Sequence, residues 1–398
     1  MANALLSALP VTIFTQMSAL ARAHDAVNLG QGFPDEPGPR SVLDAAAHAL
    51  LEASNQYPPM QGLAALRRAV ADFYAARQGL SLDPDREITV TSGATEALAA
   101  AFLGLIEPGD EVVLFQPLYD SYLPMIRRAG GVARLARLEP PHWRIDRPML
   151  ERLFTPRTRL VVLNNPLNPA ASVASAEDLA LLAEFCVRHD AIAICDEVWE
   201  QVVFDGRRHI PLLAMPGMAE RCVKIGSAGK MFALTGWKVG WMIACEALTA
   251  SLARAHQFLT FTTAPNLQSG VAFGLRACDD WFEAMPPELA RSRDRLAGGL
   301  RGEGFAVLDS EGTYFLNIDL SASGIRLGDR DFCFRAVAEA GVAAIPVSAF
   351  YETEPVTSVV RLCFAKRDAT LDAGIERLAR ARELFSKASS PRRRGEGR

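Results

Sequence analysis

Two stretches of the sequence carry residues that together could hold an organic cofactor. Lys230 lies in the run Ile225-Gly-Ser-Ala-Gly-Lys-Met-Phe-Ala-Leu-Thr-Gly-Trp-Lys238, and the acidic pair Asp196-Glu197 follows the apolar run Ala191–Cys195. A carboxylate at the end of a buried strand needs a cationic or hydrogen-bonding partner, because desolvating an unpaired ionised group is costly. The protonated nitrogen of a pyridine ring would be such a partner. Enzymes hold pyridoxal phosphate (PLP) with a lysine on its aldehyde and an acid facing its ring nitrogen, so Lys230 and Asp196 together indicate a PLP site.

A phosphate-binding turn is predicted upstream of these two residues. The segment Thr91-Ser-Gly-Ala-Thr-Glu96 passes from a predicted strand through a glycine turn into a helix over Glu96–Leu105. The free backbone amides and the dipole at a helix N-terminus favour an anion there. Taken singly, this segment could be only a helix cap. Ser227 and Lys238 are close enough in sequence to Lys230 to add a hydroxyl and a positive charge to the same site.

Two other glycine-containing runs do not fit the nucleotide-binding motifs that they suggest. Gly226–Lys230 lacks the spacing between its glycines, and the following Ser or Thr, that a P-loop requires. Gly30-Gln-Gly32 is followed by Phe-Pro-Asp, where a dinucleotide-binding turn would have its third glycine. The six histidines show no metal-ligand spacing, so no metal site is expected.

The composition is that of an ordinary globular enzyme and argues against several partner classes. The chain has 398 residues, 49% of them hydrophobic and 22% charged, and a net charge of -4. This length can bury a large core in about two or three domains, and no basic stripe of a nucleic-acid-binding surface precedes the C-terminal tail. The longest apolar stretches fall short of the ~20 residues that span a bilayer, and no basic residue precedes Arg22 as in a signal peptide. The seven cysteines lack C-x-x-C spacing and are expected to be reduced, so we expect a cytoplasmic protein. Together with the charge and the short apolar stretches, this predicts no membrane and no nucleic-acid partner.

Short β-rich runs alternate with helical runs through most of the chain, which predicts an α/β fold. Apolar strands suited to a sheet covered on both faces are expected at Glu87–Thr91, Glu111–Phe115, Arg159–Leu163, Ala191–Cys195, Cys222–Ile225 and Val239–Cys245. After about Pro286 a charged helix over Glu288–Arg301, short strands and two further helices predict a smaller α+β domain. The expected organisation is an N-terminal segment over 1–45 that contributes to the small domain and the substrate pocket, a large PLP-binding domain over 46–285, the small domain over 286–386, and a disordered basic tail over 387–398.

Four further motifs, in order along the chain, carry a resemblance to a known family. They are Asn28-Leu-Gly-Gln-Gly-Phe-Pro-Asp35, Asn55-Gln-Tyr-Pro-Pro59, Pro117-Leu-Tyr-Asp-Ser-Tyr122 and Thr235-Gly-Trp-Lys-Val-Gly-Trp241. With the Lys230 and Asp196 stretches, they resemble the class I/II aminotransferases of PLP fold type I, from about Phe14 to Phe385. The motifs are similar to those of kynurenine/glutamine, methionine and N-succinyldiaminopimelate aminotransferases. The resemblance implies a large domain with a mostly parallel central sheet, and transfer of an amino group from an L-amino acid to a 2-oxo acid by a ping-pong mechanism.

The resemblance also implies roles for individual residues. Lys230 is implied as the catalytic Schiff-base lysine, and Asp196 as the catalytic partner of the pyridine nitrogen. The other implied cofactor contacts are Gly93, Ala94, Thr95, Ser227 and Lys238 around the phosphate, Tyr119 stacked on the ring, Asn168 and Trp199 near its phenolic oxygen, and Tyr57 near the phosphate from a second chain. The implied substrate contacts are Gly32, Asn168 and Arg361, whose planar guanidinium would bind a carboxylate bidentately. Tyr57 and Thr262 match positions that cross a dimer interface, so a homodimer with shared active sites is implied.

The sequence departs from the family pattern at two places. Asn168-Pro169-Ala170-Ala171 stands where the family usually has Asn-Pro-Thr-Gly, so the loop is expected to change its turn without the glycine. Trp199 replaces the usual tyrosine, and an indole has one N–H donor but no phenol. Two alternatives therefore stay open: a cysteine-conjugate β-lyase that uses the same site, and an N-succinyldiaminopimelate aminotransferase of lysine biosynthesis. A PLP-sensing regulator is disfavoured, because no helix-turn-helix domain is expected before Phe14.

Overall fold

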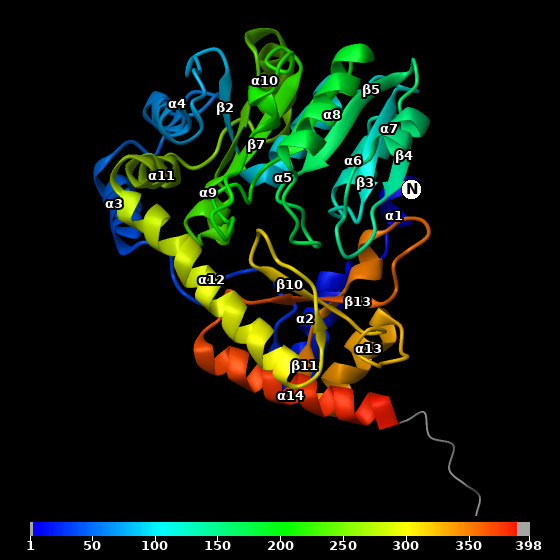
Figure 1. Cartoon of the computed structure of the whole chain (residues 1–398). Helices are drawn as coiled ribbons and strands as arrows, with labels where there is room; N and C mark the ends of the chain where they lie inside the picture. The colour runs from blue at the N-terminus through cyan, green and yellow to red at the C-terminus, as the bar shows by residue number, and fades with distance from the viewer. Residues whose placement is uncertain (1–2, 388–398) are drawn as a thin grey trace, which may run out of the picture. The chain divides into compact units, whose positions relative to one another are not determined.

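The computed structural model describes residues 3–387 and divides into two compact units (Figure 1). Unit 1 contains the residues as far as Leu9, Glu36–Glu288 and Glu311–Thr313. Unit 2 contains Pro10–Asp35, Leu289–Ser310 and the residues from Tyr314 onward. The basic tail predicted over 387–398 lies, beyond Lys387, outside the described residues.

Unit 1 is built on a seven-stranded sheet with the strand order β2-β8-β7-β6-β5-β3-β4. Its strands are β2 (Ile88–Thr91), β3 (Glu111–Gln116), β4 (Val132–Arg137), β5 (Thr158–Asn164), β6 (Ile192–Asp196), β7 (Cys222–Ser227) and β8 (Gly240–Ile243). Strands β7, β6, β5, β3 and β4 run parallel, and β8 is antiparallel to both of its neighbours, β7 and β2. The predicted mostly parallel central sheet is therefore confirmed.

The central strands are buried because their sequences are largely apolar on both faces. Both β6 and β7 are buried at every position, although β7 carries Lys224 in its middle. Such strands need no alternation of polar and apolar residues, because both sheet faces are covered. The edge strand β4 is absent from the sequence prediction, since its partly exposed arginines interrupt the apolar run.

Helices connect the strands of unit 1 and cover its sheet (Figure 1). The longer ones are α3 (Arg40–Glu52), α4 (Ala64–Gln78), α5 (Gly93–Leu105), α6 (Tyr122–Arg128), α7 (Arg147–Leu153), α8 (Ala176–Arg188), α10 (Glu246–Leu259) and α11 (Pro265–Ala277). Helix α5 packs against β7, β8 and α10. The short helix α9 (Ala228–Met231) directly follows β7.

Unit 2 contains a four-stranded antiparallel sheet with the order β12-β13-β10-β9. Its strands are β9 (Ala306–Val307), β10 (Phe315–Asp319), β12 (Ile345–Pro346) and β13 (Val359–Cys363). A separate parallel pair joins β1 (Val27–Asn28) to β11 (Val342–Ala343), which brings the N-terminal segment into this unit. The helices are α2 (Ile13–Ala23), α13 (Asp329–Arg335), the π-helix Ala336–Ala340 and α14 (Asp368–Lys387).

One helix begins earlier than the sequence predicts. The charged helix expected over Glu288–Arg301 is α12 (Asp279–Gly302), which starts in unit 1, contains Pro286 and Pro287, and continues into unit 2. A proline has no backbone N–H to donate within a helix, so α12 continues through these two positions without those two hydrogen bonds. Asp279 and Asp280 favour the earlier start, because acidic side chains stabilise the first turn of a helix. No helix within residues 3–387 combines the length and the apolar character needed to cross a membrane.

Candidate active site

Asp196 is the last residue of β6, and its carboxyl group is buried. The phenol of Tyr122, the first residue of α6, donates a 2.6 Å hydrogen bond to its Oδ2. Oδ1 has no hydrogen-bond partner among the described residues. Burial raises the pKa of Asp196, and the hydrogen bonds from Tyr122 and the backbone of Val198 partly oppose that rise. A buried acid with one oxygen left over is suited to a bound cation or N–H donor.

Lys230 lies in α9, directly after β7. Strand β7 is the neighbour of β6, and Asp196 pairs with Ile225 in the register between them. Burial raises the pKa of Asp196, and the charge of Lys230 opposes part of that rise, so the amine and the carboxyl group share one electrostatic environment. Nζ of Lys230 also lies 4.6 Å from the centre of a Trp199 ring, which is a cation–π contact. Lys230, Asp196 and Trp199 therefore lie together.

The first turn of α5 forms a candidate phosphate site. Gly93 begins the helix with a φ of +73°, a left-handed conformation that glycine adopts without strain. An added Cβ at Gly93 would lie 3.2 Å from Nζ of Lys238. The same ammonium group lies 3.4 Å from Oγ1 of Thr95 and donates to it. A helix N-terminus and a lysine therefore lie side by side, which favours an anion.

Gly240 of β8 lies between Ser227 and the first turn of α5, where Ala94 is located. Ser227, the last residue of β7, pairs with Gly240 of β8. A Cβ on Gly240 would lie 2.9 Å from the carbonyl carbon of Gly93 and 3.0 Å from the nitrogen of Ala94, so this close approach requires glycine. The five predicted phosphate contacts thus come together. Gly240 is an addition that the sequence interpretation missed, although it lies within the quoted Thr235–Trp241 motif.

Asn168 is linked to Asp196 through a second asparagine. The backbone N–H of Asn168 donates a 2.9 Å hydrogen bond to Oδ1 of Asn164, and Nδ2 of Asn164 donates a 2.9 Å bond to the backbone oxygen of Asp196. Tyr119, the predicted stacking residue, packs edge-on against Tyr122 with ring centres 5.7 Å apart. Burial raises the pKa of Tyr119, which keeps its phenol protonated near neutral pH.

The loop after Asn168 keeps a left-handed residue at the position where the family usually has glycine. Ala171 has a φ of +62° and donates a 2.7 Å backbone hydrogen bond to the oxygen of Leu167. Its own carbonyl accepts bonds from the backbone N–H groups of Glu311 and Gly312. These bonds hold an alanine in a conformation that is strained for any residue with a Cβ.

The two remaining substrate contacts, Gly32 and Arg361, belong to unit 2. Arg361 lies in β13 with 1% of its surface exposed, and its Nη2 donates a 2.8 Å hydrogen bond to the oxygen of Gly30. Its guanidinium lies 3.9 Å from the ring centre of Phe315, with the rings of Phe14 and Phe350 at 5.3 and 5.4 Å. A Cβ on Gly32 would lie 2.8 Å from the Phe315 ring, so glycine is needed there. The guanidinium is thus fixed among aromatic faces.

Tyr57 lies at the surface of unit 1, with 84% of the residue exposed. Its ring packs edge-on against Phe261 at 5.5 Å, beside Thr262, and the nearby Phe258 is 85% exposed. Thr262 itself is half-buried. The predicted cross-subunit residues therefore lie on an exposed, aromatic part of the surface.

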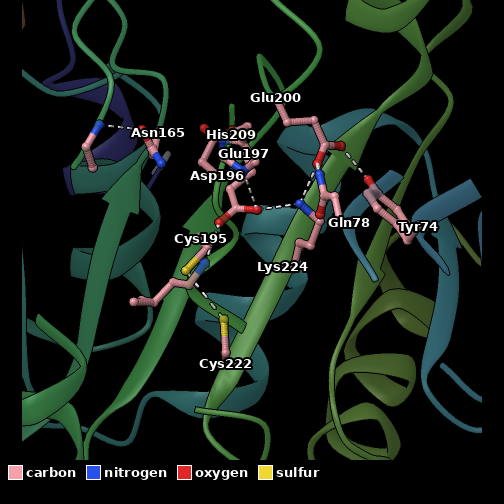
Figure 2. A network of polar contacts seen from close by, with 12 residues as sticks. Tyr74, Gln78, Asn165, Cys195, Asp196, Glu197, Glu200, His209, Cys222 and Lys224 are labelled. Carbon is pink, nitrogen blue, oxygen red and sulfur yellow. Dashed lines mark hydrogen bonds and ion pairs between the residues drawn. The ribbon is translucent and has the colours of Figure 1, made fainter. Parts of the chain in front are cut away.

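A buried polar cluster next to Asp196 was missed by the sequence interpretation (Figure 2). This Lys224 cluster consists of Tyr74, Gln78, Glu197, Glu200, His209 and Lys224. The available signal was a lysine in the middle of the otherwise apolar run Cys222–Ile225, because a fully buried lysine needs a carboxylate partner. Tyr122 was missed as well, although it ends the quoted Pro117–Tyr122 motif.

A family model for the class I and II aminotransferases matches residues 24–378. The chain belongs to this family.

Relatives with named activities are similar to this aminotransferase over nearly its whole length. A probable N-succinyldiaminopimelate aminotransferase of Mycobacterium tuberculosis is 46% identical, covering 92% of this chain and 95% of its own length. The methionine aminotransferase of Escherichia coli is 44% identical, covering 93% and 96%. The human kynurenine–oxoglutarate transaminase 1 is 36% identical, covering 90% and 93%. The solved structure of the M. tuberculosis N-succinyldiaminopimelate aminotransferase superposes with a TM-score of 0.93, covering 96% of this chain and 100% of that chain.

Class I and II aminotransferases of this fold depend on PLP, and the residues present fit that cofactor. The open oxygen of Asp196 would accept the N–H of a pyridinium. The first turn of α5, with Lys238 beside it, would bind a phosphate group. The aminotransferase and PLP predictions made from the sequence are therefore confirmed at the level of the family.

Proposed function

We propose that Lys230 and Asp196 carry out amino transfer in this enzyme, and that Arg361 binds the substrate carboxylate. The observation that carries the proposal is the open Oδ1 of Asp196, which is buried and lies in the electrostatic environment of Lys230. A buried carboxylate with an unpaired oxygen costs free energy unless a ligand supplies the missing partner. Buried acids with shifted pKa values are typical of functional sites.

The residues of unit 1 would hold PLP at four points. Lys230 would bind its aldehyde carbon and Asp196 its ring nitrogen, while Tyr119 would stack on the ring and Asn168 would contact its phenolic oxygen. The phosphate would be bound by Gly93, Ala94, Thr95, Ser227 and Lys238. When bound, PLP supplies a conjugated ring that accepts the electron pair left on the substrate Cα.

The chain supplies the proton transfer and the binding of the substrate. Nζ of Lys230 is the base that accepts the proton from the substrate Cα. The face of the Trp199 ring would favour the protonated form of that amine, because an aromatic face attracts a cation. Arg361 would bind the carboxylate of the amino acid and then that of the 2-oxo acid, so one guanidinium would serve both half-reactions of a ping-pong cycle.

We infer a donor whose Cβ is an unbranched methylene. This is the chemistry that N-succinyldiaminopimelate, methionine and kynurenine share, and these are the compounds named for the three relatives above. A cysteine-conjugate β-lyase remains a second candidate, because Trp199 replaces a phenol in the site.

A panel of donors with 2-oxoglutarate as the acceptor tests this assignment on the purified protein. We expect turnover of at least one of the three named donors, with kcat/KM well above that for valine and isoleucine. Faster turnover of the β-branched donors would overturn the donor class. Release of pyruvate and ammonia from a cysteine conjugate, without amino transfer, would favour the lyase.

Two features of the assembly and location complete the proposal. We propose a homodimer in which Tyr57 reaches the phosphate of the partner's site, supported by the exposed aromatic surface formed by Tyr57, Phe258 and Phe261. We also propose a cytoplasmic location, supported by seven free cysteines, as expected in a reducing compartment.

A further inference from the structure

Three acidic residues, Asp196, Glu197 and Glu200, lie close together at the end of β6 and differ in how many of their carboxylate oxygens have hydrogen-bond or ion-pair partners. Each oxygen of Glu197 and of Glu200 has at least one partner within the Lys224 cluster or its neighbours, whereas Oδ1 of Asp196 has none among the described residues (Figure 2). We propose that Lys224 is a positioning residue: by binding both Glu197 and Glu200 it fixes the turn that presents Asp196 and Trp199 to the cofactor. This inference rests on the proposed roles of Asp196 and Lys230.

One ammonium group joins the two ends of that turn. Nζ of Lys224 donates to Oε2 of Glu197 and, at 2.5 Å, to Oε2 of Glu200. The backbone N–H of Glu200 donates a 3.0 Å bond to the oxygen of Glu197, so these residues begin and end a tight turn. Trp199 lies inside this turn and Asp196 directly precedes it. Fixing Glu197 and Glu200 therefore fixes both residues that face the cofactor site.

Strand geometry explains why the cluster can act without entering the site. Successive side chains of a strand point to opposite faces of the sheet. Cys195 pairs with Lys224 in the register between β6 and β7, so Lys224 extends toward the face of Cys195 and, two residues on, of Glu197. Asp196 points to the other face. Lys224 is thus separated from the cofactor by the sheet and acts on Asp196 through the backbone.

The remaining contacts hold both glutamates from several elements. Glu200 accepts bonds from the phenol of Tyr74 at 2.5 Å and from Gln78 at 2.7 Å, both on α4. Glu197 accepts a 3.2 Å bond from the backbone N–H of Leu212 and lies 3.1 Å from Nε2 of His209. The side chains of Lys224, Glu197 and Glu200 are all fully buried. A turn held at both ends in this way has little freedom to reorient.

The pKa shifts and ion pairs of the Lys224 cluster indicate that the ammonium of Lys224, and not a metal ion, neutralises its carboxylates. Burial alone would lower the pKa of Lys224, but Glu197 and Glu200 outweigh burial and raise it. Burial likewise opposes ionisation of Glu197, yet Lys224 and His209 lower its pKa to about 2. Glu197, Glu200 and His209 have the spacing of metal ligands, but the ammonium of Lys224 already contacts both carboxylates. The cluster therefore carries its own positive charge.

The test must separate positioning from simple stabilisation of the fold. The double variant Lys224→Met/Glu200→Gln removes one positive and one negative charge, and it leaves Glu197 with His209 and Leu212. The single variant Glu200→Gln keeps the Lys224–Glu197 pair and removes one charge at the far end of the turn. Both are compared with the wild type for thermal unfolding without cofactor, for the PLP dissociation constant, for the visible absorbance of the bound cofactor, and for kcat and KM separately.

For the double variant we expect a PLP dissociation constant and a kcat that are each worse by about tenfold to a hundredfold, because small displacements of reacting groups are that costly. The KM for the amino donor should change little. We expect a shifted absorbance maximum of the bound cofactor, and a smaller effect of the same kind in Glu200→Gln. Should the double variant fail to fold, Glu200→Gln decides the question alone.

Native PLP affinity, absorbance and kcat in a folded double variant, with only a lower unfolding temperature, would overturn the proposal and leave the cluster a stabilising element. The same native values in Glu200→Gln would overturn it if the double variant does not fold. Failure of the proposed function looks different, because borohydride reduction of the wild-type holoenzyme would then label a lysine other than Lys230.

Discussion

The phenol of Tyr122 donates a 2.6 Å hydrogen bond to Oδ2 of Asp196, from the first turn of α6 to the end of β6. This bond occupies one carboxylate oxygen, whereas Oδ1 has no hydrogen-bond partner among the described residues. It also helps to keep Asp196 ionised, since it opposes the rise in pKa that burial causes. The orientation of the acid thus depends on a residue that was quoted in a motif but given no role from the sequence.

Tyr122→Phe should lower kcat by about tenfold or more, because a hydrogen bond to a charged group contributes about 1.5–3 kcal/mol and each 1.4 kcal/mol is about tenfold. Single-turnover kinetics with saturating donor measure this effect. Thr249→Val is the control, since it removes a buried hydroxyl in α10 that donates to the backbone oxygen of Ala244 and has no hydrogen bond to Asp196. Equal kcat values in Tyr122→Phe, Thr249→Val and wild type would show that the bond has no role in turnover.

Asp196→Asn should stabilise the cofactor-free protein at neutral pH while weakening PLP binding. Because burial raises the pKa of Asp196 in the folded state, the folded protein binds its proton more readily than the unfolded chain, whose value is near 3.8. Wild-type stability therefore falls, relative to the variant, as pH rises from about 3.8 through the raised pKa. Urea unfolding of both cofactor-free proteins between pH 4 and 8 measures the difference. If the variant is less stable throughout this range, burial of the ionised Asp196 carboxylate does not destabilise the cofactor-free protein.

Ala171→Gly should be clearly more stable than Ala170→Gly. Both alanines are buried and both variants lose one methyl group, but only Ala171 has a positive φ. A left-handed conformation costs a residue with a Cβ about 1–2 kcal/mol, which glycine avoids. Denaturant unfolding of the two variants should therefore differ by about that amount. Equal losses of stability would mean that Ala171 is not strained.

Two inactive variants should restore activity to one another if the active site is shared. Tyr57→Ala and Lys230→Ala are each expected to be inactive or severely impaired. In a hybrid dimer one site carries both defects, and the other combines its own Lys230 with Tyr57 from the partner. Mixing under subunit exchange, followed by activity assays, should recover up to one working site per hybrid. Exchange demonstrated by mass spectrometry without recovered activity would contradict the shared site.

Most of the sheet could be predicted from the sequence because buried parallel strands are uniformly apolar. Strands β3, β5, β6 and β7 were located within one or two residues. The edge strand β4 could not be found in this way, since most of its positions are partly or fully exposed and two arginines interrupt its apolar residues. The start of α12 was also misplaced, because Pro286 and Pro287 were interpreted as a boundary and lie inside the helix.

In the candidate site, too, some residues could be found from local sequence patterns, whereas others depend on contacts that only the fold creates. Lys230, Gly93 and Asp196 follow directly from local patterns of strand, turn and helix. The contacts of Tyr122 and Lys224 depend on which strands and helices become neighbours, so neither partner could be derived from spacing along the chain. Arg361 was assigned from the family resemblance alone, and its aromatic surroundings come from segments far apart in sequence.

Borohydride reduction of the PLP-loaded protein, followed by proteolysis and mass spectrometry, tests directly whether Lys230 holds the cofactor. The chain has only five lysines, Lys224, Lys230, Lys238, Lys366 and Lys387, so the labelled residue can be assigned without ambiguity. We expect a pyridoxyl group on Lys230 alone, and loss of that label in Lys230→Ala. A pyridoxyl group on any of the other four lysines in the wild-type protein would contradict the assignment of the active site.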